Sequence, residues 1–355
     1  MALKDKPINE RVHLAEQLRG LSRQIAEEVT AEFLLRHPDW VMRYGNMARL
    51  RGVEDAMFHQ NFLAAAIESG EAKAFGEYLR WTAGVLETRG ISSLFLLENV
   101  EQIVKALQSH LPPTLAPEVE EFVNYGLDVA PAGLAGVPAA SGGSTDLRNV
   151  QALYLQAILH GHRQAAVGIA VESVNQGHSL PDVYADILQE SMYEVGLLWE
   201  TNRITVAQEH MATAITQHVI AHLYPLIKPL LPKRGRMVIT GVEGEQHQVG
   251  PNIVADVLES AGWDVRFLGA NTPAAAVVQA VEDHRADVLG ISATMLFNVP
   301  NVRRLILAAR AVPGRKLSII LGGSAFRATP GLYKELGAVG VALDVRAALR
   351  LAATL

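Results

Sequence analysis

Apolar residues in the first 129 positions recur every three or four residues, which is the spacing of one helix face. Several such stripes follow one another, and prolines or a glycine separate them, as at Pro38, Gly90 and Pro112. Proline interrupts a helix because it lacks the backbone N–H, and glycine weakens it. The pattern predicts an all-helical domain over residues 1–129.

Residues 130–146, APAGLAGVPAASGGSTD, break the apolar pattern and predict a linker. Helical spacing returns over residues 147–223 and predicts a four-helix bundle. Thr205 with Gln208 three residues later is a capping-box pattern, which predicts the start of the fourth helix. A second linker, with three prolines, is predicted at residues 224–236.

Short apolar runs alternate with helical stripes over residues 237–355, and five strand–helix units predict a doubly wound parallel sheet. The expected strands are 237–241, 264–268, 287–291, 317–321 and 338–342, and the expected helices are 251–261, 273–284, 299–311, 329–336 and 344–353. The predicted fold class is therefore α and α/β: an N-terminal all-helical domain, a four-helix-bundle cap and a C-terminal Rossmann-like sheet of five parallel strands.

The loop after the first of these strands, GVEGEQHQVG, carries the most informative chemistry. It places Glu245 and His247 at the carboxyl end of a strand, where open parallel sheets bind ligands. Imidazole is a good donor for transition metals, and a carboxylate on its second nitrogen fixes the tautomer. Gly250, which opens the next helix, lets the backbone pass close to a bulky ligand.

The pattern formed by Glu245, His247 and Gly250, E-x-H-x-x-G, resembles the D-x-H-x-x-G signature of cobalamin-binding domains, with glutamate in place of aspartate. In that family the histidine is the lower axial ligand of cobalt, and the carboxylate holds its other ring nitrogen. The resemblance implies cobalamin bound base-off and His-on, with His247 as the cobalt ligand.

Two later strand ends match further elements of the same family. Ser292 and Thr294 follow the third predicted strand, and Gly322 and Gly323 follow the fourth. In the family the matching S-x-T and GG elements line a channel for the nucleotide tail of cobalamin. Alone, a glycine pair indicates a turn and S-x-T a strand end, but here the elements occur in the family's order.

The predicted bundle contains the pattern W-x9-E-H, formed by Trp199, Glu209 and His210. It resembles the cap of the light-sensing cobalamin proteins, in which the tryptophan packs on the upper adenosyl group, the glutamate accepts hydrogen bonds from its ribose and the histidine lines the pocket. In some light sensors a histidine follows the tryptophan and takes over the cobalt after illumination. This chain has Glu200 there, which argues against a bis-histidine light product by that route.

Composition narrows the classes of function. The chain has 355 residues and a net charge of -6, and residues 1–110 show no excess of basic side chains, so no nucleic-acid partner is predicted. The absence of cysteine excludes disulfides, iron–sulfur clusters, thiol catalysis and a thioether-bound tetrapyrrole. The N-terminus lacks an apolar signal core and no apolar run reaches ~18 residues, so we expect a cytoplasmic protein without a membrane partner.

The N-terminal region also holds many aromatic and cationic side chains. They are either core aromatics with solvated arginines or a pocket for a flat conjugated ligand whose carboxylates the arginines clamp. A helical domain without a DNA-binding module resembles the photocobilins, which pair cobalamin with biliverdin, and this implies a second, non-covalent bilin. No motif assigns its contacts, although Arg80, Trp81 and the region of Tyr44 are candidates. The set is Trp40, Arg43, Tyr44, Arg49, Arg51, Phe58, His59, Arg80 and Trp81.

These features favour a photoreceptor that binds adenosylcobalamin and is not an enzyme. Photolysis of its cobalt–carbon bond would change domain packing or quaternary structure, in a homodimer with an unknown downstream effector. The first alternative is a corrinoid carrier protein for methyl transfer. A mutase small domain would need a separate barrel of about 250 residues, and a scaffold with a decayed site is the last alternative.

Overall fold

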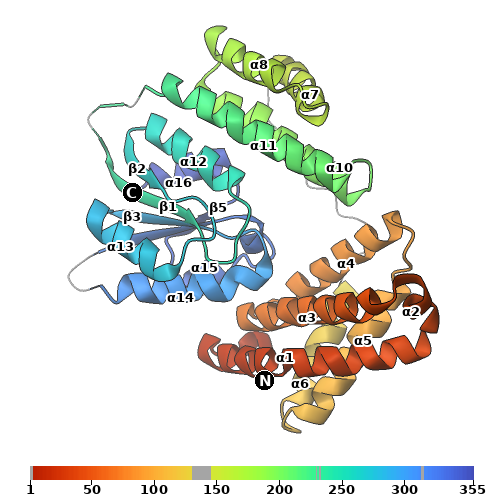
Figure 1. Cartoon of the computed structure of the whole chain (residues 1–355). Coiled ribbons are helices and arrows are strands. Elements are labelled where there is room, and N and C mark those ends of the chain that lie inside the picture. Colours follow the sequence, from red (N-terminus) through yellow and green to blue (C-terminus); the bar gives the residue numbers. More distant parts are fainter. Residues whose placement is uncertain (1–2, 130–144, 229, 232, 313–315) are drawn as a thin grey trace. The chain divides into compact units, whose positions relative to one another are not determined.

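The computed structural model describes residues 3–129, 145–228, 230–231, 233–312 and 316–355. The chain forms two compact units, residues 1–135 and 136–355 (Figure 1). Most of the predicted linker at 130–146 lies outside the described residues, and its last two positions begin a helix.

The first unit is all-helical, as predicted. Its helices are η1 (Leu3–Asp5), α1 (Ile8–Arg36), α2 (Pro38–Tyr44), α3 (Asn46–Ser69), α4 (Ala72–Thr88), α5 (Leu94–His110) and α6 (Ala116–Val129). The long helices α1 and α3 pack along each other, and residues 62–69 of α3 are all buried. At Gly76 an added Cβ would lie 2.1 Å from the carbonyl oxygen of Gly126, so glycine allows α4 and α6 to meet backbone to backbone.

The second unit begins with a helical cap. Its four main helices are α7 (Thr145–Leu159), α8 (Arg163–Asn175), α10 (Glu190–Glu200) and α11 (Val206–Leu223). The predicted capping box is present: the Thr205 side chain accepts from the backbone N–H of Gln208, whose side chain accepts from that of Thr205. Before α10 come a single turn, α9 (Leu180–Asp182), and a π-helical segment, η2 (Val183–Gln189), which the pattern did not predict. π-Helical segments concentrate at functional sites, and η2 packs against the sheet domain.

After η3 (Tyr224–Leu226), the chain forms a five-stranded parallel sheet of order β2-β1-β3-β4-β5. The strands are β1 (Gly235–Gly241), β2 (Trp263–Phe267), β3 (Val288–Ser292), β4 (Ser318–Gly322) and β5 (Gly340–Ala342). The helices are α12 (Val249–Ser260), α13 (Ala274–His284), α14 (Val299–Arg310), α15 (Leu332–Glu335) and α16 (Val345–Ala352), with short turns η4 (Leu296–Asn298) and η5 (Ser324–Phe326). Because the strand order reverses at β1, the carboxyl ends of β1 and β3, where Gly241 pairs with Ser292, form the switch point at which such sheets bind ligands.

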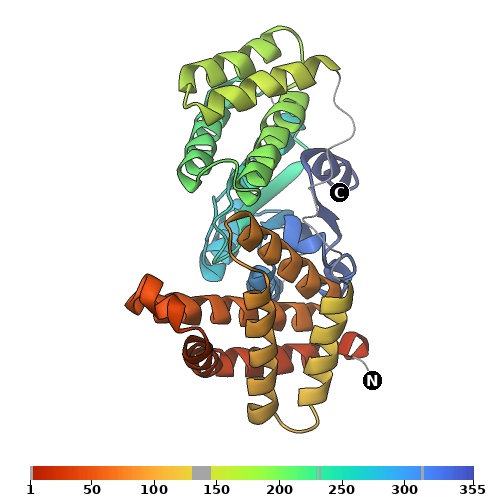
Figure 2. The same cartoon turned by 90° about the vertical axis from the view of Figure 1, so that its right-hand side faces the viewer.

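The cap packs on one side of this sheet. Figure 1 shows α12 and α16 on the side facing the cap and α13 and α14 on the other, and Figure 2 shows the cap again on one side of the sheet domain. Ile253 and Val345 belong to the same buried apolar cluster as the cap core. The Tyr184 hydroxyl donates to Asp256 Oδ2 at 2.6 Å, and Arg346 binds two aspartates of the cap. The cap core thus continues into α12 and α16, the helices on this side of the sheet.

No helix in the described part of the chain is both long and apolar enough to cross a bilayer.

Candidate functional site

The loop between β1 and α12 begins with a tight turn. The Val242 carbonyl accepts from the backbone N–H of Glu245 at 2.9 Å, and Gly244 has φ of +85°. A β-turn with positive φ at its third position favours glycine. An added Cβ at Gly244 would also lie 2.9 Å from Asn298 Oδ1. The glycine therefore makes the turn and lets the loop approach the chain after β3.

Glu245 is fully buried, and its two carboxylate oxygens accept five hydrogen bonds. Oε1 accepts from the backbone N–H of His247 at 3.0 Å and from Nδ1 of the same residue at 2.5 Å. Oε2 accepts from the backbone N–H groups of Thr294 at 2.6 Å and Met295 at 3.2 Å, and from Asn298 Nδ2 at 3.1 Å. Such a set of donors is what allows a carboxylate to be buried. The longer glutamate side chain bridges the ends of β1 and β3.

The pKa values of this pair follow from these contacts. Burial would raise the pKa of Glu245, but hydrogen bonds from the side chain and backbone of His247 and from the backbone of Thr294 outweigh it and lower the pKa to about 2. The carboxylate is therefore ionised at neutral pH, and Nδ1–H of His247 is the donor. The same hydrogen bond raises the pKa of His247, burial opposes the rise, and the charges of Glu245 and Glu209 add to it.

The other ring nitrogen of His247 remains accessible. The side chain is 57% exposed, and no hydrogen bond from the described part of the chain reaches Nε2. Close to it in sequence, Gly250 is exposed, and an added Cβ would meet no atom within 4 Å. An imidazole fixed through Nδ1 by a carboxylate, with Nε2 open, is the arrangement of a metal-ligating histidine. The open space at Gly250 suits a bulky metal-bearing ligand, so these residues fit the cobalamin that the sequence predicts.

The predicted residues at the ends of β3 and β4 lie at the same edge of the sheet. The Ser292 carbonyl accepts from the backbone N–H of Val242 at 3.1 Å. The Ser324 hydroxyl donates to the Thr294 carbonyl at 2.9 Å, while the N–H of Thr294 bonds to Glu245. These bonds tie the three loops that follow β1, β3 and β4 into one structure.

The glycine pair after β4 has a structural reason of its own. Gly323 has φ of +94°, and an added Cβ would lie 2.2 Å from the carbonyl oxygen of Ala293. At Gly322 an added Cβ would lie 3.2 Å from the carbonyl oxygen of Ala342. Close approach of the backbone segments therefore explains both glycines. The channel for a nucleotide tail at this position stays a prediction.

The cap contributes one charged group to the same region. Glu209, in the first turn of α11, accepts from His210 Nδ1 at 2.5 Å and from Thr213 Oγ1 at 3.0 Å. Its charge contributes to the raised pKa of His247, so the structure brings these two residues near each other. Trp199, at the end of α10, is partly buried against the cap core, and the His210 side chain is 75% exposed. Their roles toward a cofactor stay predictions.

The sequence analysis missed Gly244 and Asn298. The first had a signal, since glycine between a strand and a helix is a common turn residue. Asn298 had none. Its amide reaches Glu245 across 53 positions of sequence and only the sheet topology makes them neighbours.

The aromatic set of the first unit separates into two groups. Around α2, the rings of Trp40 and Tyr44 lie 5.5 Å apart. Between α3 and α4, His59 Nδ1 lies 2.5 Å from the Tyr78 hydroxyl, and Phe62 stacks on the same tyrosine at 3.6 Å. Burial lowers the pKa of His59 to about 4, so it is neutral. These contacts make the second group part of a packed core, and a bilin in this unit stays a prediction.

Two family models match the second unit. Both are described as a B12 binding domain, and they match residues 150–224 and 235–352, which correspond to the cap and the sheet domain. Residues 1–149 lie outside both matches.

Curated relatives agree with these models. Dimethylamine corrinoid protein 1 of Methanosarcina acetivorans is 30% identical over 184 residues, which cover 50% of this chain and 83% of that protein. Dimethylamine corrinoid protein 3 of Methanosarcina mazei is 31% identical over 155 residues, covering 41% and 89%. The solved monomethylamine corrinoid protein of Methanosarcina barkeri matches with a TM-score of 0.52 and 20% identity, over 58% of this chain and 97% of that one, which shows a shared fold.

Proposed function

We propose that this chain, which belongs to the family of B12-binding proteins, is a corrinoid carrier that holds its cofactor at the carboxyl edge of the sheet for methyl transfer. One observation carries the proposal. Glu245 is buried, held by five hydrogen bonds, and presents His247 with its Nε2 open at the switch point of the sheet. The relatives named as dimethylamine corrinoid proteins support the carrier role.

Each residue has a defined part in this proposal. His247 would hold cobalt through Nε2, and Glu245 would fix the tautomer and orientation of the ring and raise its basicity. Asn298 would hold the carboxylate in place. When bound, the corrinoid would supply a metal that accepts and releases a methyl group. No group of the chain itself is assigned a catalytic step, and the partner enzymes would supply the methyl donor and acceptor.

A second candidate function is light sensing with adenosylcobalamin, the function that the sequence analysis favoured. The observation in its favour is that Glu209, a member of the W-x9-E-H pattern, lies near His247. In this function Trp199 would pack on the adenine and Glu209 would accept hydrogen bonds from the ribose. A biliverdin in the first unit and a homodimer that responds to light belong to this candidate. It ranks second because the two relatives described above are named as corrinoid proteins, which supports the carrier role.

The two candidates separate in one experiment. The purified protein is loaded in the dark with methylcobalamin or adenosylcobalamin, with and without biliverdin, and affinity, absorbance and size-exclusion elution are compared before and after green light. Because free alkylcobalamins are also photolabile, elution is the decisive readout. Binding of methylcobalamin with elution unchanged by light supports the carrier. A strong adenosyl preference with light-dependent elution overturns it in favour of the sensor, and failure to bind either cobalamin overturns both.

A further inference from the structure

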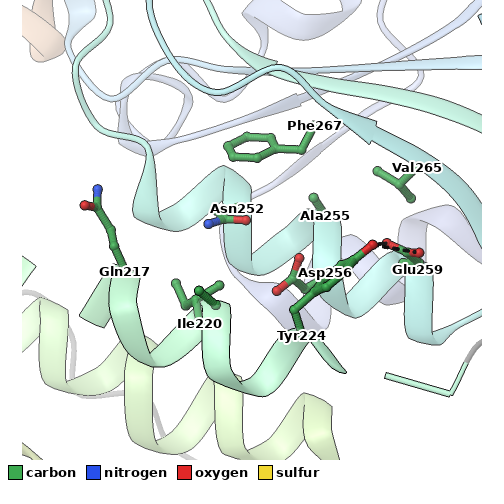
Figure 3. A pocket seen from close by; sticks show the side chains of 10 residues that line it. Gln217, Ile220, Tyr224, Asn252, Ala255, Asp256, Glu259, Val265 and Phe267 are labelled. Carbon is green, nitrogen blue, oxygen red and sulfur yellow. Dashed lines mark hydrogen bonds between the residues drawn. The ribbon is translucent and has the colours of Figure 1, made fainter. Parts of the chain in front are cut away.

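A cavity lies where the cap meets the edge of the sheet domain. It has a volume of about 320 Å³ and is bounded by α11 of the cap, α12 and the edge strand β2 (Figure 3). This volume is at the lower end of the range of small-molecule sites, about 300 to 1,000 Å³. The cavity therefore suits a ligand of few atoms.

Several polar groups that line this cavity could accept or donate further hydrogen bonds. Asp256 is 5% exposed, and its Oδ2 accepts the hydroxyl of Tyr184 at 2.6 Å. No donor in the described part of the chain reaches its Oδ1. The side-chain amides of Asn252 and Gln217 also line the cavity and make no hydrogen bond within that part. Because Oδ1 is not a fully buried atom, it is accessible at the cavity and can accept a hydrogen bond from a ligand or from water.

The charge of the cavity is negative. Asp256 and Glu259 both line it, and among the described residues its lining contains no Lys, Arg or His. In the part of the chain that the structure describes, Glu259 accepts a hydrogen bond from the Tyr224 hydroxyl, 3.3 Å from each carboxylate oxygen. Burial raises the pKa of Asp256 to about 6, the hydroxyl of Tyr184 opposes the rise, and the charge of Glu259 adds to it. Two neighbouring carboxylates repel each other and are costly to bury when both are charged. A bound cation would offset this cost.

The rest of the lining is apolar. Phe267 and Val265 extend from the edge strand, and Ile220 and Ala255 extend from the two helices (Figure 3). We propose that this cavity binds a small organic ammonium ion, with the charged nitrogen between Asp256 and Glu259 and the alkyl part against the apolar wall. The amides would supply the remaining hydrogen bonds.

The position of the cavity gives such a ligand a structural effect. It would contact α11 of the cap and α12 of the sheet domain together, so its binding would favour their packing. Any ligand whose site depends on the same packing would be coupled to it reciprocally. The inference does not depend on the corrinoid proposal, since His247 and Glu245 are not among the residues that line the cavity.

The test is isothermal titration calorimetry of the full chain without cobalamin, at pH 8 and moderate salt. The probes are butylammonium, tetramethylammonium and 1,4-diaminobutane, with butanol and butyrate as neutral and anionic analogues of the first. We expect one or more ammonium probes to bind and both analogues to fail. Glu259→Gln and Asp256→Asn should weaken binding by about tenfold or more, since hydrogen bonds to charged groups contribute about 1.5 to 3 kcal/mol.

Glu282→Gln, an exposed change on α13 outside the cavity with the same change in net charge, is the matched control and should stay within about twofold, as surface changes do. If Asp256→Asn does not fold, Glu259→Gln and Gln217→Leu still test the site. Absence of binding by all three ammonium probes, equal binding of butanol and butylammonium, or equal losses in Glu259→Gln and Glu282→Gln would overturn the proposal.

Discussion

The second unit contains two carboxylate–imidazole pairs with the same contact distance and different surroundings. His247 Nδ1 and Glu245 Oε1 lie 2.5 Å apart, as do His210 Nδ1 and Glu209 Oε2. Glu245 is fully buried and receives donors from two loops, whereas Glu209 is 29% exposed and, within the described residues, its other donor is the hydroxyl of Thr213. Only the first pair is held by the sheet.

The comparison teaches that distance alone does not define a metal-ligand pair. A histidine side chain that can still rotate loses conformational entropy when it binds a metal. An imidazole ring that is already fixed by its carboxylate partner does not have this cost. The sheet edge fixes His247 through Glu245, and the cap leaves His210 exposed on a helix surface. The difference supports the proposal that His247, and not His210, would hold the cobalt.

Replacing the two histidines should give the largest contrast. Outer-shell partners typically contribute about 10- to 100-fold to metal affinity, and removal of the ligand itself should cost more. We expect His247→Ala to weaken cobalamin binding by more than about 100-fold and to remove the axial nitrogen signature from the absorbance and, for the cobalt(II) form, from the EPR spectrum. His210→Ala should keep the axial nitrogen. An unchanged spectrum in His247→Ala would show that the cobalt ligand lies elsewhere.

Replacing the two carboxylates should give the next largest difference in cobalamin affinity. Glu245→Gln keeps the size of the side chain but removes the charge that raises the basicity of His247, so affinity for cobalamin should fall by about 10- to 100-fold. Glu209→Gln should change the affinity for methylcobalamin by less than about threefold, because exposed charges contribute little. Dark titrations followed by absorbance would measure both. A large loss for adenosylcobalamin alone in Glu209→Gln would instead favour the light sensor, and equal losses in both variants would refute the distinction between the pairs.

Removing one hydrogen-bond donor from each carboxylate should give a smaller difference, which we expect in the free energy of unfolding. Asn298→Ala removes one of five donors from a buried charge and should lower the free energy of unfolding by about 1.5 kcal/mol. Thr213→Ala removes a donor from a partly exposed carboxylate and should change it by less than about 0.5 kcal/mol. Urea denaturation of the cobalamin-free protein gives both values. Equal values would mean that the buried carboxylate is not held by this amide.

Most helices and strands could be predicted from the spacing of apolar residues along the chain. Apolar residues repeat every two positions in a strand and every three or four in a helix, so neighbouring residues alone distinguish the two. The capping box of Thr205 and Gln208 is also formed by residues close in sequence. The π-helical segment η2 was missed because its residues have an ordinary helical pattern and only their packing against α12 distinguishes them.

The site was predictable only where its partners lie close in sequence. Glu245 and His247 are two positions apart, so a motif could bring them together. Asn298 and the cavity at Asp256 depend on contacts between distant segments, and no spacing indicates them. The motif also could not show that Gly323 is needed for its positive φ and its approach to Ala293, with or without a ligand.

The pH dependence should give the smallest effect and the finest test of the buried pair. The raised pKa of His247 contributes stability that is present below about 6.5 and is lost as the pH rises through the folded value. The lowered pKa of Glu245 contributes stability that is present above about 4.5 and is lost as the pH falls toward 2. In the cobalamin-free protein we therefore expect the Tm of the wild type to exceed that of Glu245→Gln most between about pH 4.5 and the pKa of His247. An NMR titration should place the His247 pKa above 6.5 and move it lower in Glu245→Gln, because the hydrogen bond to the carboxylate is the largest cause of the rise and burial then prevails. His210→Ala should leave this titration in place, and a His247 pKa that does not change in Glu245→Gln would show that the carboxylate does not control the ring.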